Sequence, residues 1–547
     1  MIKKTAILAA LESLIERLEL VETQPFRIKA YQRLREVLAE LPDSAWTSAT
    51  ALDAELRQRA GIGEGLRRIA RELYDTGTAP LLEDMKHQVP ESVVELRRLP
   101  GLGPKRIQEL WKELGIVSVD ALAQAIERGK LNNRKGWSPS LIERLRQGIA
   151  VYKAQRHTLL YHEALHVWDE AIEPLRRRGL KVEPVGEVRR ALPLVHSVEG
   201  ILLTEGAQFA KNIGWYHLNA DTLVHPTLPI KLYLVERDAW GLALLRLTGP
   251  SSFWEVLQTR LPHELKAISE EEVFSVLGLP YILPAWRDWD DIIVLAEKGF
   301  LPEPLTTSHI QGSVHVHTTY SDGADSLQAM AEAARAQGWK WLGIADHSQR
   351  ATYARGLSPE QLMKQAQEID TLNQQYHGTF TLLKGIEADI LPDGKIDYDE
   401  TLWQRLDYIV ASIHEKLHMS RAEATQRLEQ ALSNPYVRVL GHWTGRLLRS
   451  RPGYPIDEEK ILTLCAERGI AIEFNANPHR MEIDWRWVRR AAELGVRIIL
   501  TTDAHTVSEI SYWRSGLAVL QKGLLPPTLL LNTEELAPFK PSHPKAT

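Results

Sequence analysis

The chain has 547 residues and a mass of 62.0 kDa, and its 44% hydrophobic and 25% charged residues are typical of several globular domains. No run of about 18 apolar residues occurs, which argues against a membrane span, and a single cysteine, Cys465, excludes an internal disulfide framework and fits a reducing cytoplasm. The formal net charge of −5 is unevenly spread, because residues 1–155 contain 25 Lys and Arg against 21 Asp and Glu, a net +4, which leaves −9 for the remainder.

The first 155 residues are predicted to be helical. Apolar residues recur at helical spacing in AILAALESLIERLEL and FRIKAYQRLREVLAEL, and a second helical block extends to about residue 155. The chain begins like a signal peptide, but Glu12 and Glu16 interrupt the apolar stretch and no small-residue cleavage site follows, so we expect an amphipathic helix. The positive charge of this part suits contact with phosphate, with an ordinary fluctuation of charge as the equal alternative.

Two segments of this part share one pattern, an apolar residue followed by Gly-x-Gly and the start of a helix: GIGEGLRRI at 61–69 and LPGLGPKRI at 99–107. The glycines allow a tight hairpin whose backbone N–H groups point outward at a helix N-terminus, an anion site suited to a DNA phosphate. The segments resemble helix-hairpin-helix motifs, with a degenerate third copy at RKGWSPSLIERL and simple turns as the alternative reading. The resemblance implies contact with duplex backbone regardless of base sequence. The predicted DNA-binding residues are Gly61, Gly63, Gly101, Gly103, Lys105 and Arg106.

The middle of the chain combines both kinds of secondary structure. Strands are predicted at VEGILLT and IKLYLVE within a mixed region over 156–245, and helices are predicted over 246–300. A linker follows at 301–312, marked by its two prolines.

From residue 313 to residue 547, short β-rich runs alternate with amphipathic helices. The seven runs are SVHVHT, KWLGIAD, FTLLKGIE, YIVASIH, VRVLGH, AIEFNA and RIILTTD. Such alternation implies parallel strands with right-handed crossovers, and a distorted (β/α)7 barrel is the natural closure. In barrels of this type, ligands and catalytic groups lie at the carboxyl ends of the strands.

Potential metal ligands occur where these strands end. His315 and His317 are two residues apart in the first run and are expected to face the same side of a strand. A single histidine is more simply explained as a structural residue, but coincidence does not explain nine such side chains at the ends of six of the seven strands. Imidazoles mixed with carboxylates suit Mn²⁺, Zn²⁺ or Fe²⁺ better than Mg²⁺ or Ca²⁺. The nine predicted ligands are His315, His317, Asp322, His347, Glu387, His414, His442, Asp503 and His505.

The motifs HVHTTYSDG, ADHS, GIEADI, ASIH, GHWTGR, NANPHR and TTDAH resemble, in this order, those of the PHP (polymerase and histidinol phosphatase) domain. The resemblance implies three divalent metal ions, with Mn²⁺ as the expected metal, bridged by Glu387 and a water. The three implied ligand sets are His315, His317, Glu387 and Asp503; Glu387, His414 and His442; and Asp322, His347 and His505. Clustered ions activate water for phosphodiester hydrolysis. Ser313 stands where the family often has an acidic residue, but that position is not a ligand.

Two arginines lie in loops beside the predicted ligands. Arg446 in GHWTGR and Arg480 in NANPHR are predicted to bind substrate phosphate, because a guanidinium group matches a phosphate bidentately. Ordinary surface arginines are the alternative for each.

The order of hairpins, mixed region, helices and PHP-like domain resembles that of bacterial family X DNA polymerase. QPFRIKAYQRL, GEVRR, LTGP and VFSVLGLPYILP fall where that family has its signatures. The resemblance implies a helical amino-terminal domain at 1–80, fingers at 81–155, a palm of α+β type at 156–245, a helical thumb at 246–300, a linker at 301–312 and the PHP domain at 313–547.

The departures from that family fall on the polymerase catalytic positions. Where the palm has an Asp-x-Asp pair, this chain has Ser197 and Glu199, and Lys231 replaces the third aspartate on the later strand. The missing acids would hold the metal ions of nucleotidyl transfer. We therefore expect polymerase activity to be lost, with an alignment shift that recruits Glu187 or Asp221 as the alternative.

Two other signature positions also differ. Pro250 occupies the last place of the family's Thr-Gly-Ser motif, and the thumb segment after it is shortened. Ile69 occupies the place of the family's lyase lysine, so we expect no Schiff-base lyase activity.

We therefore expect a metal-dependent 3′–5′ exonuclease of DNA repair that acts on gapped, nicked or 3′-ended duplex. Incision of abasic sites and removal of 3′-phosphates are further activities that such a site could perform. The alternatives, in order, are a bifunctional polymerase with exonuclease, a small-molecule phosphatase of the histidinol-phosphatase type, and a non-catalytic DNA-binding scaffold. A cytoplasmic monomer without membrane attachment is expected, although the sequence leaves the oligomeric state open.

Overall fold

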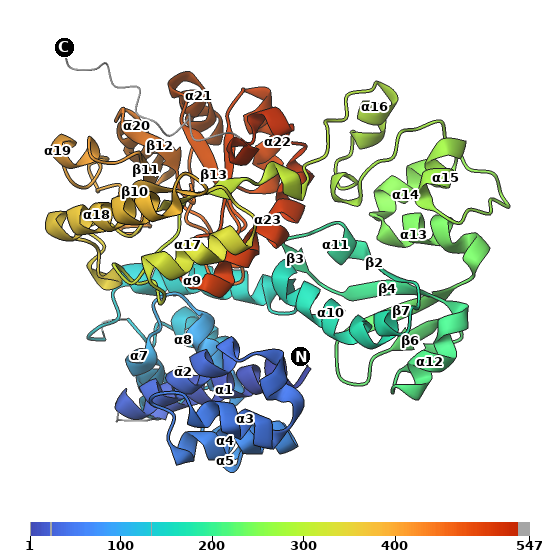
Figure 1. Cartoon of the computed structure of the whole chain (residues 1–547), viewed down its shortest axis with the longest axis horizontal. Coiled ribbons are helices and arrows are strands. Elements are labelled where there is room, and N and C mark those ends of the chain that lie inside the picture. Colours follow the sequence, from blue (N-terminus) through green and yellow to red (C-terminus); the bar gives the residue numbers. More distant parts are fainter. Residues whose placement is uncertain (1, 22–24, 133, 534–547) are drawn as a thin grey trace. The chain divides into compact units, whose positions relative to one another are not determined.

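A computed structural model describes residues 2–21, 25–132 and 134–533, so Gln24 of the amino-terminal motif and residues 534–547 of the predicted last domain lie outside the described residues. The chain forms two compact units (Figure 1). The first contains residues 1–156 together with 449–451, and the second contains residues 157–448 and those from 452 onward. No helix of the described part is long and apolar enough to cross a membrane.

The first unit is helical, as the apolar spacing predicts. Its two hydrophobic clusters are separate: one gathers side chains between Ile7 and Leu82, and the other gathers Leu20 with side chains between Val89 and Tyr152. The helices are α1 (Ile2–Val21), α2 (Pro25–Glu40), α3 (Ala49–Arg57), α4 (Glu64–Thr76), α5 (Pro80–Gln88), α6 (Glu91–Val94), α7 (Pro104–Gln108), α8 (Val119–Glu127) and α9 (Pro139–Gln155).

The second unit begins with a five-stranded sheet, here called the central sheet, in the order β2-β4-β7-β6-β5. Its strands are β2 (Val182–Val185), β4 (Val198–Leu203), β5 (Tyr216–Asn219), β6 (Thr222–Val224) and β7 (Ile230–Val235). Both strands predicted here are present, as β4 and β7, and they pair in parallel. Helix α10 (Tyr161–Arg177) covers one face, where the ring of Trp168 lies so close to Gly200 that a Cβ there would be only 2.4 Å from it.

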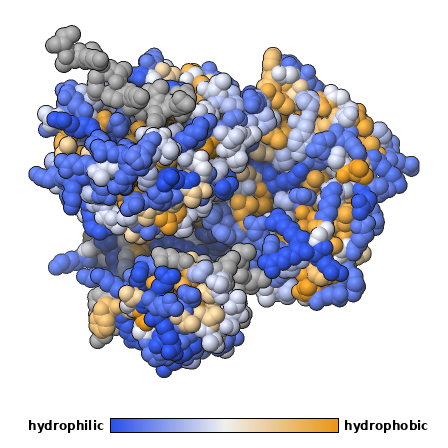
Figure 2. Space-filling view, in the orientation of Figure 1, coloured by the Kyte–Doolittle hydropathy of each residue, from blue (hydrophilic) through white to orange (hydrophobic). Residues whose placement is uncertain are grey.

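A helical segment follows, here called the thumb-like segment. It contains α13 (Trp240–Thr248), α14 (Ser251–Gln258), α15 (Glu270–Val276) and α16 (Ile292–Glu297), which enclose a small core that includes Phe253, Phe274 and Trp286. Figure 2 shows a mostly hydrophilic surface with apolar areas over this segment, where Val276, Val294 and Phe300 are exposed.

The rest of the second unit is a barrel of seven parallel strands in the order β14-β13-β12-β11-β10-β9-β8. The strands are β8 (Gly312–Ser313), β9 (Trp341–Ile344), β10 (Thr381–Asp389), β11 (Tyr408–Ser412), β12 (Val437–Leu440), β13 (Ala471–Asn475) and β14 (Ile498–Thr501). A bridge between Val316 and Ala504 nearly closes the barrel. All seven strands were predicted, and their continuous burial reflects cover on both faces.

Helices fill the crossovers between these strands (Figure 1). They are α17 (Leu327–Ala336), α18 (Pro359–Tyr376), α19 (Glu400–Trp403), α20 (Arg421–Leu432), α21 (Glu458–Arg468) and α22 (Trp485–Glu493), and α23 (Trp513–Leu520) follows the last strand.

The first barrel strand is much shorter than SVHVHT suggests. It ends at Ser313, and His315 adopts a left-handed backbone with φ of 64°. His315 and His317 do lie in one group of potential ligands, but not through alternation along a strand as expected, since the strand ends before both residues. Asp503 also has a positive φ, 51°, and such backbone conformations are costly for residues other than glycine.

A buried lysine joins the three parts of the second unit. The ammonium of Lys522, after α23, donates hydrogen bonds to the carbonyl of Arg190 at 2.9 Å, to the carbonyl of Ala285 at 3.2 Å and to Asp288. Its side chain is fully buried, and Trp286 donates to the neighbouring carbonyl of Gln521 at 2.8 Å. The barrel, the central sheet and the thumb-like segment thus meet at one polar junction.

Candidate metal centre

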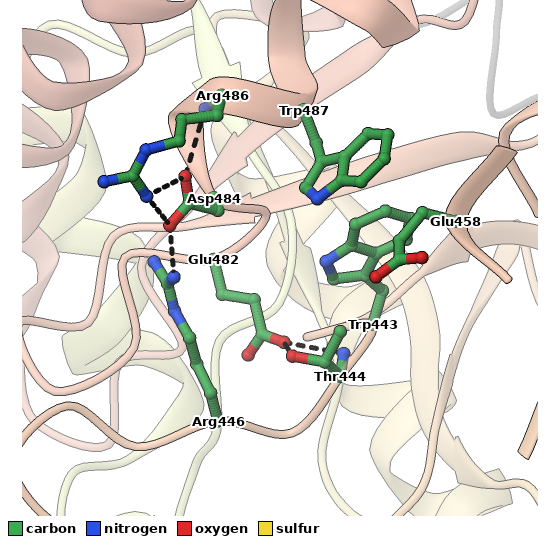
Figure 3. A pocket seen from close by; sticks show the side chains of 8 residues that line it. All are labelled: Trp443, Thr444, Arg446, Glu458, Glu482, Asp484, Arg486 and Trp487. Carbon is green, nitrogen blue, oxygen red and sulfur yellow. Dashed lines mark hydrogen bonds and ion pairs between the residues drawn. The ribbon is translucent and has the colours of Figure 1, made fainter. Parts of the chain in front are cut away.

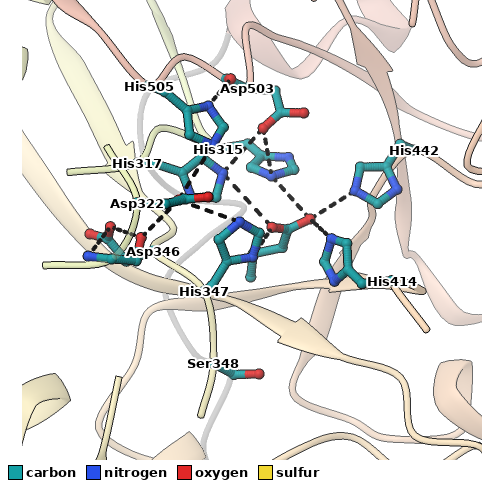
Figure 4. Close-up of polar contacts among 12 residues, drawn as sticks. His315, His317, Asp322, Asp346, His347, Ser348, His414, His442, Asp503 and His505 are labelled. Atoms are coloured by element: carbon teal, nitrogen blue, oxygen red, sulfur yellow. Dashed lines mark hydrogen bonds and ion pairs between the residues drawn. The ribbon is translucent and has the colours of Figure 1, made fainter. Parts of the chain in front are cut away.

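All nine side chains predicted as ligands lie around one centre at the carboxyl ends of the barrel strands (Figure 4). Three groups within it bring potential ligand atoms within 4.8 Å of one another: His317, Asp322, His347 and His505; His315, His317 and Asp503; and His347, Glu387 and His414.

Glu387 occupies the middle of this centre and is almost fully buried. One carboxylate oxygen, Oε1, lies 2.9 Å from Nε2 of His442, 3.1 Å from Nε2 of His414 and 3.3 Å from Nε2 of His315. The other oxygen, Oε2, lies 2.9 Å from Nδ1 of His347. A carboxylate that faces imidazoles on both oxygens can bridge two cations.

The remaining ligands flank this carboxylate. Oδ1 of Asp503 lies 3.1 Å from Nε2 of His317 and 3.7 Å from Nε2 of His315. Oδ1 of Asp322 lies 3.5 Å from Nε2 of His505 and 3.6 Å from Nε2 of His347. The observed groups resemble the implied ligand sets without matching them. The group around Asp322 contains the implied residues His347 and His505 together with His317, whereas the group around Asp503 lacks Glu387 and the group around Glu387 contains His347 in place of His442.

Three buried acids behind the ligands were missed by the sequence reasoning. Glu473 accepts from the ring of His315 at 2.5 Å and from the backbone N–H of His442 at 2.6 Å. Asp389 lies 2.8 Å from Nδ1 of His414. Acids in this position fix the orientation of ligand imidazoles and increase their basicity.

The third of these acids, Asp346, shapes the loop that carries Asp322. It accepts from the backbone N–H and the hydroxyl of Thr318 at 2.8 and 2.7 Å, and from Ser321 and Gln365. Asp346 and Asp389 stand inside the motifs ADHS and GIEAD, so adjacency to a ligand was a usable signal for both, whereas Glu473 had none.

The charges of the centre favour cations. Burial alone would raise the pKa of Glu387 and Asp503, but the surrounding imidazoles hold the pKa of both carboxyls well below the usual range. Burial also lowers the pKa of His414, yet Glu387 and Asp389 outweigh it and raise this pKa to about 10. A field that holds a proton on a buried imidazole will also hold a divalent cation.

Several buried ligand atoms have no hydrogen-bond partner among the described residues, namely His315 Nε2, His317 Nδ1, His347 Nδ1, His442 Nδ1 and Glu387 Oε2. Buried polar atoms are otherwise almost always paired. The 2.9 Å approach of His347 to Glu387 likewise lacks hydrogen-bond geometry. Unpaired ligand atoms that converge from several strands fit bound metal ions of the kind that imidazole and carboxylate prefer.

The two predicted phosphate arginines have different surroundings. Arg480 donates through Nε to Asp503 at 3.1 Å, while its buried Nη1 has no partner among the described residues. The guanidinium of Arg446 donates to Asp484 at 2.6 Å, to the carbonyl of Arg480 at 3.0 Å and to the carbonyl of Met481. Arg446 is therefore committed to holding the loop that carries Arg480.

The two hairpins of the first unit have one geometry. Gly61 and Gly101 have φ of 83° and 84°, and Gly63 and Gly103 are the N-caps of α4 and α7. A Cβ at Gly61 would meet nothing within 4 Å, so its left-handed backbone, not space, calls for glycine there. Next to these glycines, Lys105 is exposed, and Arg106 donates to the carbonyl of Gly101 at 2.8 Å.

The central sheet places side by side the three residues that the sequence analysis predicted at the polymerase catalytic positions. The β4–β7 register pairs Glu199 with Lys231, and the Lys231 ammonium lies 2.8 Å from Oε1 of Glu199. The hydroxyl of Ser197 donates to the same carboxylate at 2.8 Å, and that of Tyr233 donates at 3.2 Å. Burial alone would raise the pKa of Glu199, but Lys231 and Ser197 lower it. This carboxylate is fully neutralised from within the chain.

Comparison with known proteins shows the family to which this chain belongs. The model of the PHP domain matches residues 313–477. A "DNA polymerase/3'-5' exonuclease PolX" of Bacillus subtilis (strain 168) is 31% identical over an alignment that covers 97% of this chain and 98% of that protein. The chain belongs to the PolX family.

Other relatives match only part of this chain. A probable phosphatase of Aliivibrio fischeri is 31% identical over 40% of this chain and 84% of its own length. A probable phosphatase of Thermoanaerobacter sp. (strain X514) is 28% identical over 40% of this chain and 89% of its own length. Membership of the PolX family therefore rests on the alignment that runs through both units.

Proposed function

We propose that the chain is a metal-dependent 3′–5′ exonuclease that acts on DNA and that lacks polymerase activity. The observation that carries this proposal is the contrast between two acidic sites in one PolX chain. The barrel holds carboxylates and imidazoles whose buried ligand atoms lack partners, while the central sheet holds one acid that Lys231 already neutralises.

Three divalent ions, with Mn²⁺ as the expected metal, would be held by the nine converging residues. His315, His317, Glu387 and Asp503 would hold one, Glu387, His414 and His442 a second, and Asp322, His347 and His505 a third. When bound, such ions lower the pKa of water and neutralise charge on a phosphate under attack.

The chain's own residues prepare this site. Glu473 and Asp389 orient His315 and His414 through the hydrogen bonds described above. Arg480 donates through Nε to Asp503, and its unpartnered Nη1 is proposed to hold one substrate phosphate oxygen. Arg446 is assigned a positioning role, since its guanidinium holds the backbone of Arg480 and Met481.

The hairpins of the first unit are proposed to hold the DNA backbone. Each presents exposed backbone at a helix N-terminus, which attracts phosphate without reading bases. Gapped, nicked or 3′-ended duplex is the expected substrate, and incision at abasic sites or removal of 3′-phosphates would use the same metal centre.

Two other functions have support of their own. The Bacillus subtilis relative is named a polymerase as well as an exonuclease, which favours a bifunctional enzyme as the second candidate. The partial matches to probable phosphatases favour a small-molecule phosphatase, although that reaction gives no role to the hairpins.

One gel separates these functions. A labelled primer–template is incubated with the purified protein and Mn²⁺, with and without deoxynucleotides. Shortening under both conditions supports the exonuclease, and lengthening with deoxynucleotides supports the bifunctional enzyme. An unchanged primer together with hydrolysis of a sugar phosphate would leave only the phosphatase.

A further inference from the structure

A pocket of about 260 Å³ lies on the barrel, outside the nine ligands (Figure 3). Its walls come from two loops and two helix starts, and its lining residues are Trp443, Thr444, Arg446, Glu458, Glu482, Asp484, Arg486 and Trp487. The volume is below the roughly 300–1,000 Å³ of sites for drug-sized ligands, which suits a group of one or two rings.

The pocket shares both of its loops with the metal centre. Trp443 and Thr444 directly follow the ligand His442 in the chain. On the other loop, Glu482 pairs through its backbone with Asn475, whose amide donates to Asp503 at 3.0 Å. The two loops that line the pocket therefore also carry one predicted ligand and a residue that pairs with a neighbour of another.

One oxygen of Glu482 is unused inside the protein. Its Oε1 accepts from the backbone N–H of Thr444 at 2.6 Å and from the Thr444 hydroxyl. The residue is fully buried, yet its Oε2 has no hydrogen-bond partner among the described residues. A buried acceptor in this state needs a donor from a ligand or water.

The other polar groups of the lining are mostly paired. Asp484 accepts from Arg446 at 2.6 Å and from the side chain of Arg486 at 3.0 Å (Figure 3). With Glu458 and Glu482, the lining has three acids against two arginines, so a phosphate is disfavoured. A neutral group with an N–H donor is the better match.

Two indoles supply an aromatic surface. The rings of Trp443 and Trp487 lie 6.2 Å apart at 73°. Trp443 is buried, while Trp487 is half-buried and keeps ring surface at the pocket. Aromatic side chains of this kind stack with nucleobases of any sequence.

We propose that this pocket binds a nucleobase of the DNA strand at the metal centre and favours bases with an exocyclic amino group. Trp487 stacks with the base, and Oε2 of Glu482 accepts from the amino group. This inference rests on the proposed DNA substrate, and it adds a base preference that the metal centre and hairpins do not supply.

The first test uses nucleosides, which carry no phosphate. Binding of deoxycytidine and deoxyuridine to the full chain in EDTA is measured by saturation-transfer difference NMR. Cytosine has an amino group at C4 where uracil has a carbonyl, and N3 is an acceptor in cytosine but carries an N–H in uracil. Deoxycytidine should bind at least about tenfold more tightly, because Oε2 of Glu482 is proposed to contact the C4 substituent and would meet a carbonyl there in uracil. Equal affinities would overturn the base preference without any variant.

Variants locate the binding. Trp487→Ala should weaken both nucleosides about tenfold or more, because the stacking surface is lost. Glu482→Gln places an amide donor where Oε2 stands, and should reduce or reverse the preference for deoxycytidine. Trp254→Ala, a half-buried tryptophan of the thumb-like segment, is the matched control and should change neither affinity. Binding unaffected by Trp487→Ala would place the base elsewhere and sink the assignment.

A second test uses the nuclease. Duplexes with 3′ tails of deoxycytidine should show a lower KM than those with tails of deoxyuridine, and Trp487→Ala should raise KM with little change in kcat. Nucleoside discrimination without DNA cleavage would keep the base pocket and reject the nuclease. Cleavage without any discrimination in either assay would keep the nuclease and reject the pocket.

Discussion

The barrel centre and the central sheet treat their carboxylates in opposite ways. In the barrel, Glu387 faces imidazoles on both oxygens, and several buried atoms of the predicted ligands lack hydrogen-bond partners among the described residues. In the central sheet, Glu199 is paired with Lys231 at 2.8 Å and accepts from Ser197. An acid that is already paired with a cationic side chain has little affinity for a metal ion. A buried cluster whose acids and imidazoles lack partners has a high affinity for one.

The largest effect is expected from removing a ligand of the barrel. His317→Ala or Asp503→Ala should reduce exonuclease activity by roughly 10³-fold or more, since a metal contributes several kcal/mol to the transition state and 1.36 kcal/mol is about tenfold. Affinity for duplex DNA should remain nearly intact, because the proposed DNA contacts lie in the first unit. Cleavage rates and fluorescence anisotropy with labelled duplex measure the two quantities.

Chelation and a neutral substitution are the controls for this prediction. EDTA should reproduce the loss of cleavage, and Mn²⁺ should restore it. Asp393→Ala, an exposed aspartate of the same barrel, should be without effect. An Asp503→Ala protein that loses DNA affinity as steeply as cleavage would contradict the division of labour between the units.

The second prediction concerns the central sheet. The wild-type chain should not extend a primer, because Glu199, the single carboxylate at the three positions predicted to be catalytic, is already paired with Lys231. The substitutions Ser197→Asp, Glu199→Asp and Lys231→Asp together should give little extension, since Pro250 also departs from the predicted Thr-Gly-Ser motif of the nucleotide site. Template-directed synthesis by wild-type protein, freed of host polymerase, would show that the contrast with the barrel is wrong.

An intermediate effect is expected behind the ligands. Asp389→Asn removes the negative charge that holds the ring of His414 at 2.8 Å. Activity or metal affinity should fall about 10–100-fold, the usual range for groups that orient a ligand. Metal titration of activity gives the measurement: excess Mn²⁺ should recover much of the loss, whereas a purely structural defect would lower the melting temperature and would not respond to metal.

The smallest effect is expected in the hairpins. Lys105→Ala should weaken binding of duplex DNA several-fold, to a similar extent for all sequences, and should lower the salt slope of log Kd by about one. Anisotropy titrations over a range of KCl concentrations measure both. An unchanged slope would mean that Lys105 makes no phosphate contact.

Much of the barrel could be predicted from the sequence, because parallel strands bury both faces and leave their ligands in short motifs at strand ends. The seven strands and the family were predicted correctly. The path through His315 could not be predicted, since a left-handed residue inside an apparent strand leaves no periodic signal. The role of Glu473 was equally invisible, because it depends on contacts with His315 and His442 that are distant in sequence.

The roles of the two arginines also depend on contacts that the sequence does not show. Arg446 and Arg480 look equivalent as residues in loops beside the ligands. Only the contacts distinguish them. Arg446 donates hydrogen bonds to Asp484 and to two backbone carbonyls, whereas Nη1 of Arg480 has no partner among the described residues. Residue type predicts what a side chain can bind, and its neighbours decide whether that capacity is still available.

The buried ammonium of Lys522 bears on whether the barrel can fold without the segments that precede it. Its hydrogen-bond acceptors, the carbonyls of Arg190 and Ala285 and the carboxylate of Asp288, all precede residue 301. A barrel truncated at that point would leave the Lys522 ammonium without these three acceptors. It would also expose Leu524, which packs in the core of the thumb-like segment. In this chain, the barrel and the segments before residue 301 therefore depend on one another for the pairing of this lysine.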